Sequence, residues 1–159
     1  MIPVLLFLSL AASSASLQST FTVEELAQYR LSLPAFRQFD EASRSIATAI
    51  RDQPQLNVPP LFTRELLLDG DAPVVAAELA ARLSREPSFA AALREAGMSA
   101  HEYARFALAL FAARLAHGFV GSGAIRRVPE GVATHNVAFI DAHQTEVSAL
   151  LKLLGVEGP

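Results

Sequence analysis

Cysteine is absent from this chain of 159 residues, and lysine occurs once, as Lys152. Without cysteine the protein has no disulfide framework, no thiol nucleophile, no thiolate metal site and no covalently attached c-type haem. A lipid anchor on an N-terminal cysteine is excluded for the same reason. The preference for arginine over lysine, with the many alanines, indicates a G/C-rich bacterial coding bias and not a chemical requirement.

The chain also lacks a large excess of either positive or negative charge. The formal net charge is −3, and no basic stripe occurs beyond Arg126 and Arg127. Proteins that bind nucleic acid concentrate lysine and arginine on one face, so we exclude nucleic acid as a partner. The sequence contains no Gly-x-Ser-x-Gly motif, no P-loop and no dinucleotide fingerprint, and therefore offers no recognisable catalytic signature.

The N-terminus combines a short apolar run, Pro3 to Leu10, with small residues directly after it. This pattern is typical of a secretory signal peptide, and the run is far shorter than the ~20 apolar residues of a membrane span. Ser13 and Ala15 fit the small-x-small rule, which predicts cleavage after Ala15. We therefore expect residues 1–15 to be a signal peptide and the mature protein to be periplasmic or secreted.

One feature of this N-terminus departs from the signal-peptide pattern. No lysine or arginine precedes the apolar run, so only the terminal amine supplies positive charge. The alternative is an N-terminal helix that is not cleaved and packs on the rest of the protein. In either case residues 16–159 have the length of one domain and show no internal repeat.

Hydrophobic periodicity predicts an all-α fold, a small bundle of about four to five helices. Pro34 falls inside the first predicted helix, which indicates a kink or a break near Ser32. Residues 53–71 are rich in Pro, Asn, Asp and Gly and are expected to form a long connection. The predicted helices cover residues 22–52, 72–85, 88–96, 100–120 and 134–154.

The segment 100–120 is apolar on nearly every face, which is typical of the central helix of a domain. Its alanines form a smooth side that lets a neighbouring backbone come close: Ala109, Ala112, Ala113 and Ala116. Arg105 and Arg114 oppose a membrane-spanning interpretation, because charged side chains are costly in lipid. We therefore expect no membrane span in the mature chain.

His143 is the sharpest candidate for a functional side chain. At helical spacing it falls in the middle of the apolar stripe of the last predicted helix, where its ring nitrogens need partners. Other polar residues are expected on inward faces or near one end of the bundle, and together they form a candidate ligand-binding cluster. Its members are His143, His117, Arg114, Asp40, Ser43 and Asn136.

Several interpretations of this cluster stay open. His143 is either part of a ligand, metal or haem site or a core histidine bonded to Asp40, Ser43 or a backbone carbonyl. The Glu-x-x-His pairs of di-iron bundles are missing, and haem would require His117 and His143 to face each other. We predict no resident cofactor and no metal ligand. His135, at a helix start, is expected to be solvated.

The segment after the central helix is apolar and rich in glycine. Phe119, Val120 and Ile125 are hydrophobic, while Gly118, Gly121 and Gly123 favour turns. Such a segment is either a mobile loop that meets a partner or an ordinary connection between two helices.

The sequence therefore predicts an exported bacterial helical bundle that acts as a binding or interaction module without catalysis. Its expected partner is an unidentified protein or a small apolar ligand. The first alternative is a metal- or haem-binding bundle that uses His143 with His117. The second is an enzyme with an unrecognised site, for which Ser43, His143 and Asp40 would be a possible triad.

Overall fold

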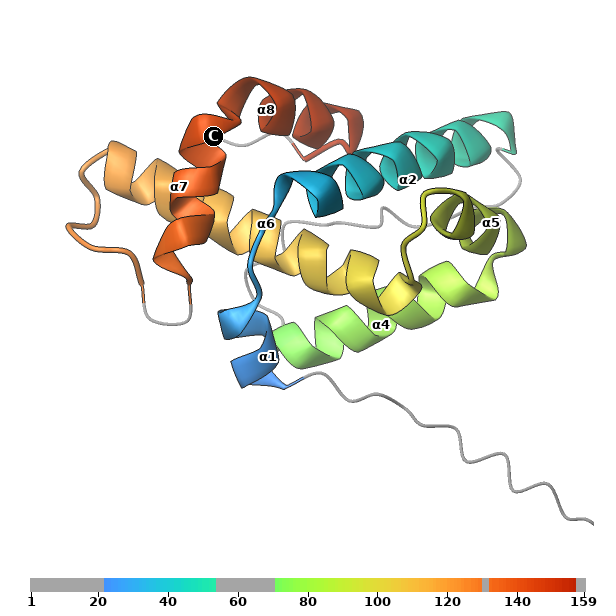
Figure 1. Ribbon diagram of the computed structural model, residues 1–159, viewed down its shortest axis with the longest axis horizontal. Helices are drawn as coiled ribbons and strands as arrows, with labels where there is room; N and C mark the ends of the chain where they lie inside the picture. The colour runs from blue at the N-terminus through green and yellow to red at the C-terminus, as the bar shows by residue number, and fades with distance from the viewer. Residues whose placement is uncertain (1–21, 54–70, 130–131, 157–159) are drawn as a thin grey trace, which may run out of the picture.

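The structure is a computed structural model that describes residues 22–53, 71–129 and 132–156 (Figure 1). Within these ranges the chain forms seven helices and no strand, which confirms the predicted all-α fold. The predicted number of four to five helices is too low for the described residues, because two predicted helices are each divided in two. The helices are α1 (Val23–Gln28), α2 (Leu33–Asp52), α4 (Ala72–Arg85), α5 (Pro87–Glu95), α6 (Ala100–Gly121), α7 (Thr134–Ala142) and α8 (Gln144–Leu153).

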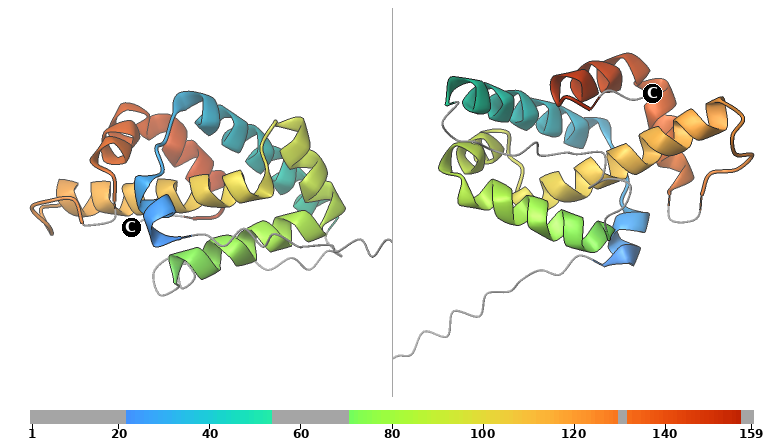
Figure 2. Two further views of the ribbon diagram at one scale, coloured as in Figure 1. Left: turned by 60° about the horizontal axis from the view of Figure 1, so that its bottom comes forward. Right: turned by 180° about the vertical axis from the view of Figure 1, so that it is seen from behind.

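Helix α6 runs through the middle of the bundle in all three views (Figures 1 and 2). It packs against α1, α2, α4, α5 and α7, while α8 packs against α2 and α7. The predicted central helix is therefore central. The predicted signal peptide and the connection over residues 54–70 lie outside the described residues.

Helix α1 begins at a capping box. The Thr22 hydroxyl oxygen accepts a hydrogen bond from the Glu25 amide at 3.1 Å, and the Glu25 carboxylate accepts one from the Thr22 amide at 3.0 Å. The chain then leaves the helix after Gln28 and restarts at Ser32, whose hydroxyl accepts from the Ala35 amide. Pro34 lies in the first turn of α2, where its missing N–H costs no hydrogen bond. The predicted break is confirmed.

The inward face of α2 differs from the predicted one. Because residues 29–32 are not helical, the helical phase read from α1 does not carry over into α2. Leu33 is exposed and Asp40 lies at the edge of the buried face, so the prediction that Asp40 points inward is wrong. The buried residues are Phe36, Phe39, Ala42, Ser43 and Ile46.

Helices α4 and α5 follow the predicted pattern. The inward face of α4 contains Val75, Leu79 and Leu83, all of which are buried. Helix α5 ends at Glu95, and the turn after it contains Gly97, which has a φ of 70°. A Cβ at this position would also approach Gln38 Nε2 to 3.3 Å, so glycine is favoured by conformation and by space.

Aromatic side chains fill the contact between α2 and α6. The Phe39 ring lies 4.4 Å from that of Tyr103 and 4.8 Å from that of Phe106, measured between centroids. Phe36 and Tyr29 extend the cluster, with centroids 6.4 and 6.2 Å from Phe106. Aromatic pairs of this kind contribute about 0.5–1.5 kcal/mol each beyond the area they bury, so this cluster anchors α2 on α6.

Of the helices in the described ranges, α6 alone is long and apolar enough to cross a membrane by length and composition. The core helix of a bundle meets the same criteria. Its contacts with five other helices and its buried aromatic residues account for its apolar character.

The start of α6 forms one half of a capping box. Ser99 Oγ accepts a hydrogen bond from the Glu102 amide at 3.0 Å, but the Glu102 carboxylate accepts one from the Tyr29 hydroxyl at 2.6 Å. The Arg105 guanidinium lies over the Tyr29 ring, 5.2 Å from its centroid. Burial, followed by the bond to Glu102, raises the pKa of Tyr29. These contacts hold the end of α1 against α6.

The last predicted helix is interrupted at His143. This residue has φ −124° and ψ 30°, which ends α7 at Ala142 and starts α8 at Gln144. The chain turns there, so that α7 packs against α6 while α8 lies against α2 (Figures 1 and 2). The prediction of one straight helix with His143 in the middle of its buried stripe is wrong, whereas the predicted stop at Gly155 is confirmed by its φ of 71°.

Candidate functional site

Ser43 pairs with a tyrosine of the central helix. Its Oγ lies 2.8 Å from the Tyr103 hydroxyl oxygen, and both side chains are fully buried. Burial raises the pKa of Tyr103 above its usual value, so this phenol is neutral and bonded. The Ser43 hydroxyl therefore lies inside the core between α2 and α6.

Asn136 links α7 to the segment between α1 and α2. Its Oδ1 accepts a hydrogen bond from the Leu31 amide at 2.9 Å, and its Nδ2 donates one to the Tyr29 carbonyl at 2.8 Å. Asn136 is almost fully buried. The two bonds use one amide hydrogen and one lone pair, and they leave the second amide hydrogen of the side chain for another partner.

Asp40 and Arg114 lie at the periphery of the core. Both carboxylate oxygens of Asp40 accept hydrogen bonds from Arg44 Nε, at 2.9 and 3.0 Å, within α2. This contact raises the pKa of Arg44. Arg114 is half-buried near the end of α6, and a Cβ built on Gly118 would lie 3.7 Å from its Nη1.

The two candidate histidines occupy different settings. His117 Nε2 lies 3.4 Å from Asp141 Oδ1, a contact between α6 and α7. His143 is half-buried at the junction of α7 and α8, where its ring lies 4.5 Å from that of Phe139 at an angle of 42°.

The structure does not join the six predicted residues through any hydrogen bond that we find among the described residues. Each of the four with a side-chain bond uses a partner outside the predicted set. In the described ranges, no group of three or more histidine and carboxylate side chains is placed to hold a metal ion. A ligand-binding role for the six residues stays a prediction, and one of them, Asn136, borders a cavity.

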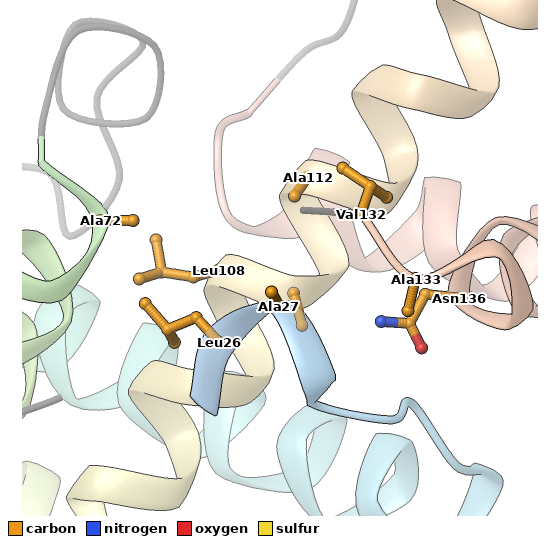
Figure 3. A pocket seen from close by; sticks show the side chains of 9 residues that line it. Leu26, Ala27, Ala72, Leu108, Ala112, Val132, Ala133 and Asn136 are labelled. Carbon is orange, nitrogen blue, oxygen red and sulfur yellow. The ribbon is translucent and has the colours of Figure 1, made fainter. Parts of the chain in front are cut away.

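That cavity lies between α1, α4, α6 and the start of α7 and has a volume of about 140 Å³. In Figure 3, Leu26 and Leu108 lie on one side of Ala27, and Ala133 and Asn136 lie on the other. Among the lining residues, Asn136 has a polar side chain and the others are apolar. We name this space the alanine cavity, because five of its nine lining residues are alanine: Leu26, Ala27, Ala72, Leu108, Ala109, Ala112, Val132, Ala133 and Asn136.

Short side chains explain the hollow. Ala109 and Ala112 belong to the smooth side of α6, which the sequence predicts to receive a close neighbour. Ala27 of α1 and Ala72 of α4 face the same space, and methyl groups on several sides do not fill it. The sequence shows the alanines but not which of them face each other across a gap.

His135 departs from the prediction that it is solvated. The residue is half-buried beside Arg30, and its Nε2 is a buried nitrogen without a hydrogen-bond partner in the described part of the chain. Desolvation, with a smaller contribution from the Arg30 charge, lowers the pKa of His135. The neutral imidazole is therefore the favoured form.

The geometry thus presents a half-open apolar hollow bordered by a single amide, and candidate polar residues that bond elsewhere. Comparisons with models of protein families, with curated proteins and with solved structures find no significant match to this chain.

Proposed function

We propose that this chain is an exported binding module without catalysis, and that its binding site is the alanine cavity. The observation that carries the proposal is an apolar hollow, partly open to solvent, that is lined from four elements and bordered by the buried Asn136. Small-molecule sites are concave and mostly apolar, with a few polar groups. An apolar hollow with one amide at its border therefore makes a candidate binding site.

The size of the cavity limits its occupant to one apolar group. Pockets for drug-sized ligands have volumes of roughly 300–1,000 Å³, whereas an apolar cavity of about 150 Å³ accepts a molecule such as benzene. The occupant therefore has the size of a benzene ring or one branched aliphatic group. Asn136 is the polar residue at the border of this space.

The candidate polar residues favour binding over catalysis. The hydroxyl of Ser43 is bonded to Tyr103 in the core, and the carboxylate of Asp40 is bonded to Arg44. A nucleophile needs a base within hydrogen-bond reach and access to a substrate. The alternative of a haem held by two histidines is weakened in the same way, because His117 contacts Asp141.

Export is supported by the sequence of residues 1–15 alone. The expected result is a protein from the cell envelope or the medium that begins at Ser16. Recovery of the protein with an intact Met1 would contradict export while leaving the cavity proposal unaffected.

Titration with benzene tests the cavity directly. We expect saturable chemical-shift changes at the methyl groups of Ala109 and Ala112 in NMR spectra of the full chain. Ala112→Leu fills the cavity and should abolish them. Ala77→Leu adds the same side chain to an exposed position of α4 and should leave binding intact. Absence of saturable shifts in the wild type, or their persistence in Ala112→Leu, would refute the proposal.

A further inference from the structure

The last turns of α6 extend beyond the rest of the bundle. In every view the end of α6 and the segment that follows it form an extremity of the described chain (Figures 1 and 2). Phe119 is 49% exposed and Val120 is 37% exposed, and both count among the few large exposed hydrophobic side chains of the described residues. We name residues 119–127 the α6 tip.

The tip is held in shape by its own backbone. The Phe119 carbonyl accepts hydrogen bonds from the Ser122 hydroxyl at 3.1 Å and from the Ile125 amide at 3.2 Å, and the Val120 carbonyl accepts one from the Gly123 amide at 3.1 Å. A Cβ built on Gly121 or Gly123 would meet no atom within 4 Å. The tip is therefore a short hydrogen-bonded turn, and Phe119 and Val120 are exposed on it.

The tip is also positively charged within an acidic protein. Arg126 and Arg127 are exposed, and residues 118–129 contain no aspartate or glutamate, although the whole chain carries −3. Glu130 follows this stretch in the sequence. The carboxylate of Asp141 on the neighbouring α7 faces His117. Two exposed arginines next to two exposed apolar side chains match a surface that is anionic outside and apolar beneath.

We propose that the α6 tip docks on the surface of an anionic phospholipid bilayer. Phe119 and Val120 enter the boundary between headgroups and acyl chains, while Arg126 and Arg127 contact lipid phosphates. A protein partner fits less well, because a specific protein interface buries about 1,200–2,000 Å² and so short a tip offers little area. A bilayer accepts a small apolar insertion supported by basic residues. This attachment is interfacial and does not depend on the alanine cavity.

A single tryptophan reports on the tip, because the chain contains none. In the Phe119→Trp full-length protein, we expect a blue shift of the emission on addition of phosphatidylglycerol–phosphatidylcholine vesicles, and quenching by brominated lipids. The control is Val74→Trp, which places the reporter at an equally exposed apolar position, 52% exposed, on α4. This control also separates docking of the tip from attachment through the apolar N-terminal run. Equal quenching at both positions, or none at position 119, would overturn the proposal.

The charge contribution is tested in the same Phe119→Trp background. A basic residue near an anionic surface strengthens partitioning by a factor of about five, so Arg126→Gln with Arg127→Gln should weaken it about 25-fold. Arg37→Gln with Arg94→Gln removes the same charge from exposed positions on α2 and α5 and should weaken the partitioning to vesicles far less. Added salt should weaken the wild-type interaction. Equal losses in the two double variants would contradict docking through the tip.

Self-association is the competing outcome. If the tip is a protein interface, the emission of the Phe119→Trp protein shifts to the blue as protein concentration rises without vesicles, and sedimentation shows a dimer that the Phe119→Ser variant lacks. That result would replace the membrane proposal. A monomeric Phe119→Trp protein whose emission responds only to anionic vesicles would support it.

Discussion

The long first part of α6 and its C-terminal end both carry apolar side chains, but they lie in opposite environments. From Ala100 to Ala116 the helix is surrounded by α1, α2, α4, α5 and α7, and its aromatic side chains are buried. From His117 to Gly121 the same helix continues, with Phe119 49% and Val120 37% exposed. Apolar composition alone therefore does not define a core. Burial depends on which neighbours pack against the helix, and an apolar end that is only partly covered is available for a partner.

The largest expected difference separates two phenylalanines of this helix. Phe106→Ala removes a fully buried ring that contacts Tyr29, Phe36 and Phe39, and it should lower the free energy of unfolding by about 3–5 kcal/mol. Phe119→Ala should change it by no more than about 0.5 kcal/mol. Urea denaturation followed by circular dichroism measures both. Similar losses would show that the tip is packed like the core.

A medium effect is expected at the polar contact inside the buried part. Tyr103→Phe keeps the ring but leaves the Ser43 hydroxyl buried without its phenol partner, which should cost about 1–2 kcal/mol. Adding Ser43→Ala to this variant should restore part of the loss, because the unpaired hydroxyl is removed as well. If the second substitution deepens the loss, the hydroxyl has another partner in the core.

The smallest effects are expected at two glycines of the tip. Gly121→Ala should stabilise the protein by up to about 0.5 kcal/mol, because this position is helical and has open space around it. Gly123→Ala should destabilise it by about 1 kcal/mol, because its φ of 74° suits glycine. Thermal denaturation of the pair measures the difference. Equal effects of the two substitutions would mean that the left-handed turn at the tip is not maintained in solution.

Local signals in the sequence predict much of the fold. Thr22 and Ser99 mark helix starts, Gly97 and Gly155 mark stops, and Pro34 marks the break before α2, because each of these residues acts on backbone groups within a few positions of itself. The interruption at His143 has no such signal: Ala142, His143 and Gln144 include neither glycine nor proline. The turn there allows α7 to pack against α6 and α8 to pack against α2. These packing partners are distant in sequence from the turn.

The candidate site is harder to predict from the sequence than the fold. Periodicity places Ser43 and Asn136 on inward faces, and both are buried. It does not reveal their partners, since Tyr103 and the backbone of Tyr29 and Leu31 come from other elements. The alanine cavity depends on how closely four elements approach one another. That distance is set by all their side chains together.

The two hydrogen bonds of Asn136 also constrain the order in which the protein is assembled. They join residues separated by 105 and 107 positions in the chain, from Leu31 and Tyr29 to the start of α7. A ribosome must therefore synthesise most of the chain before these two bonds can form. Until then, the segment between α1 and α2 lacks its partner on α7 and remains accessible to chaperones.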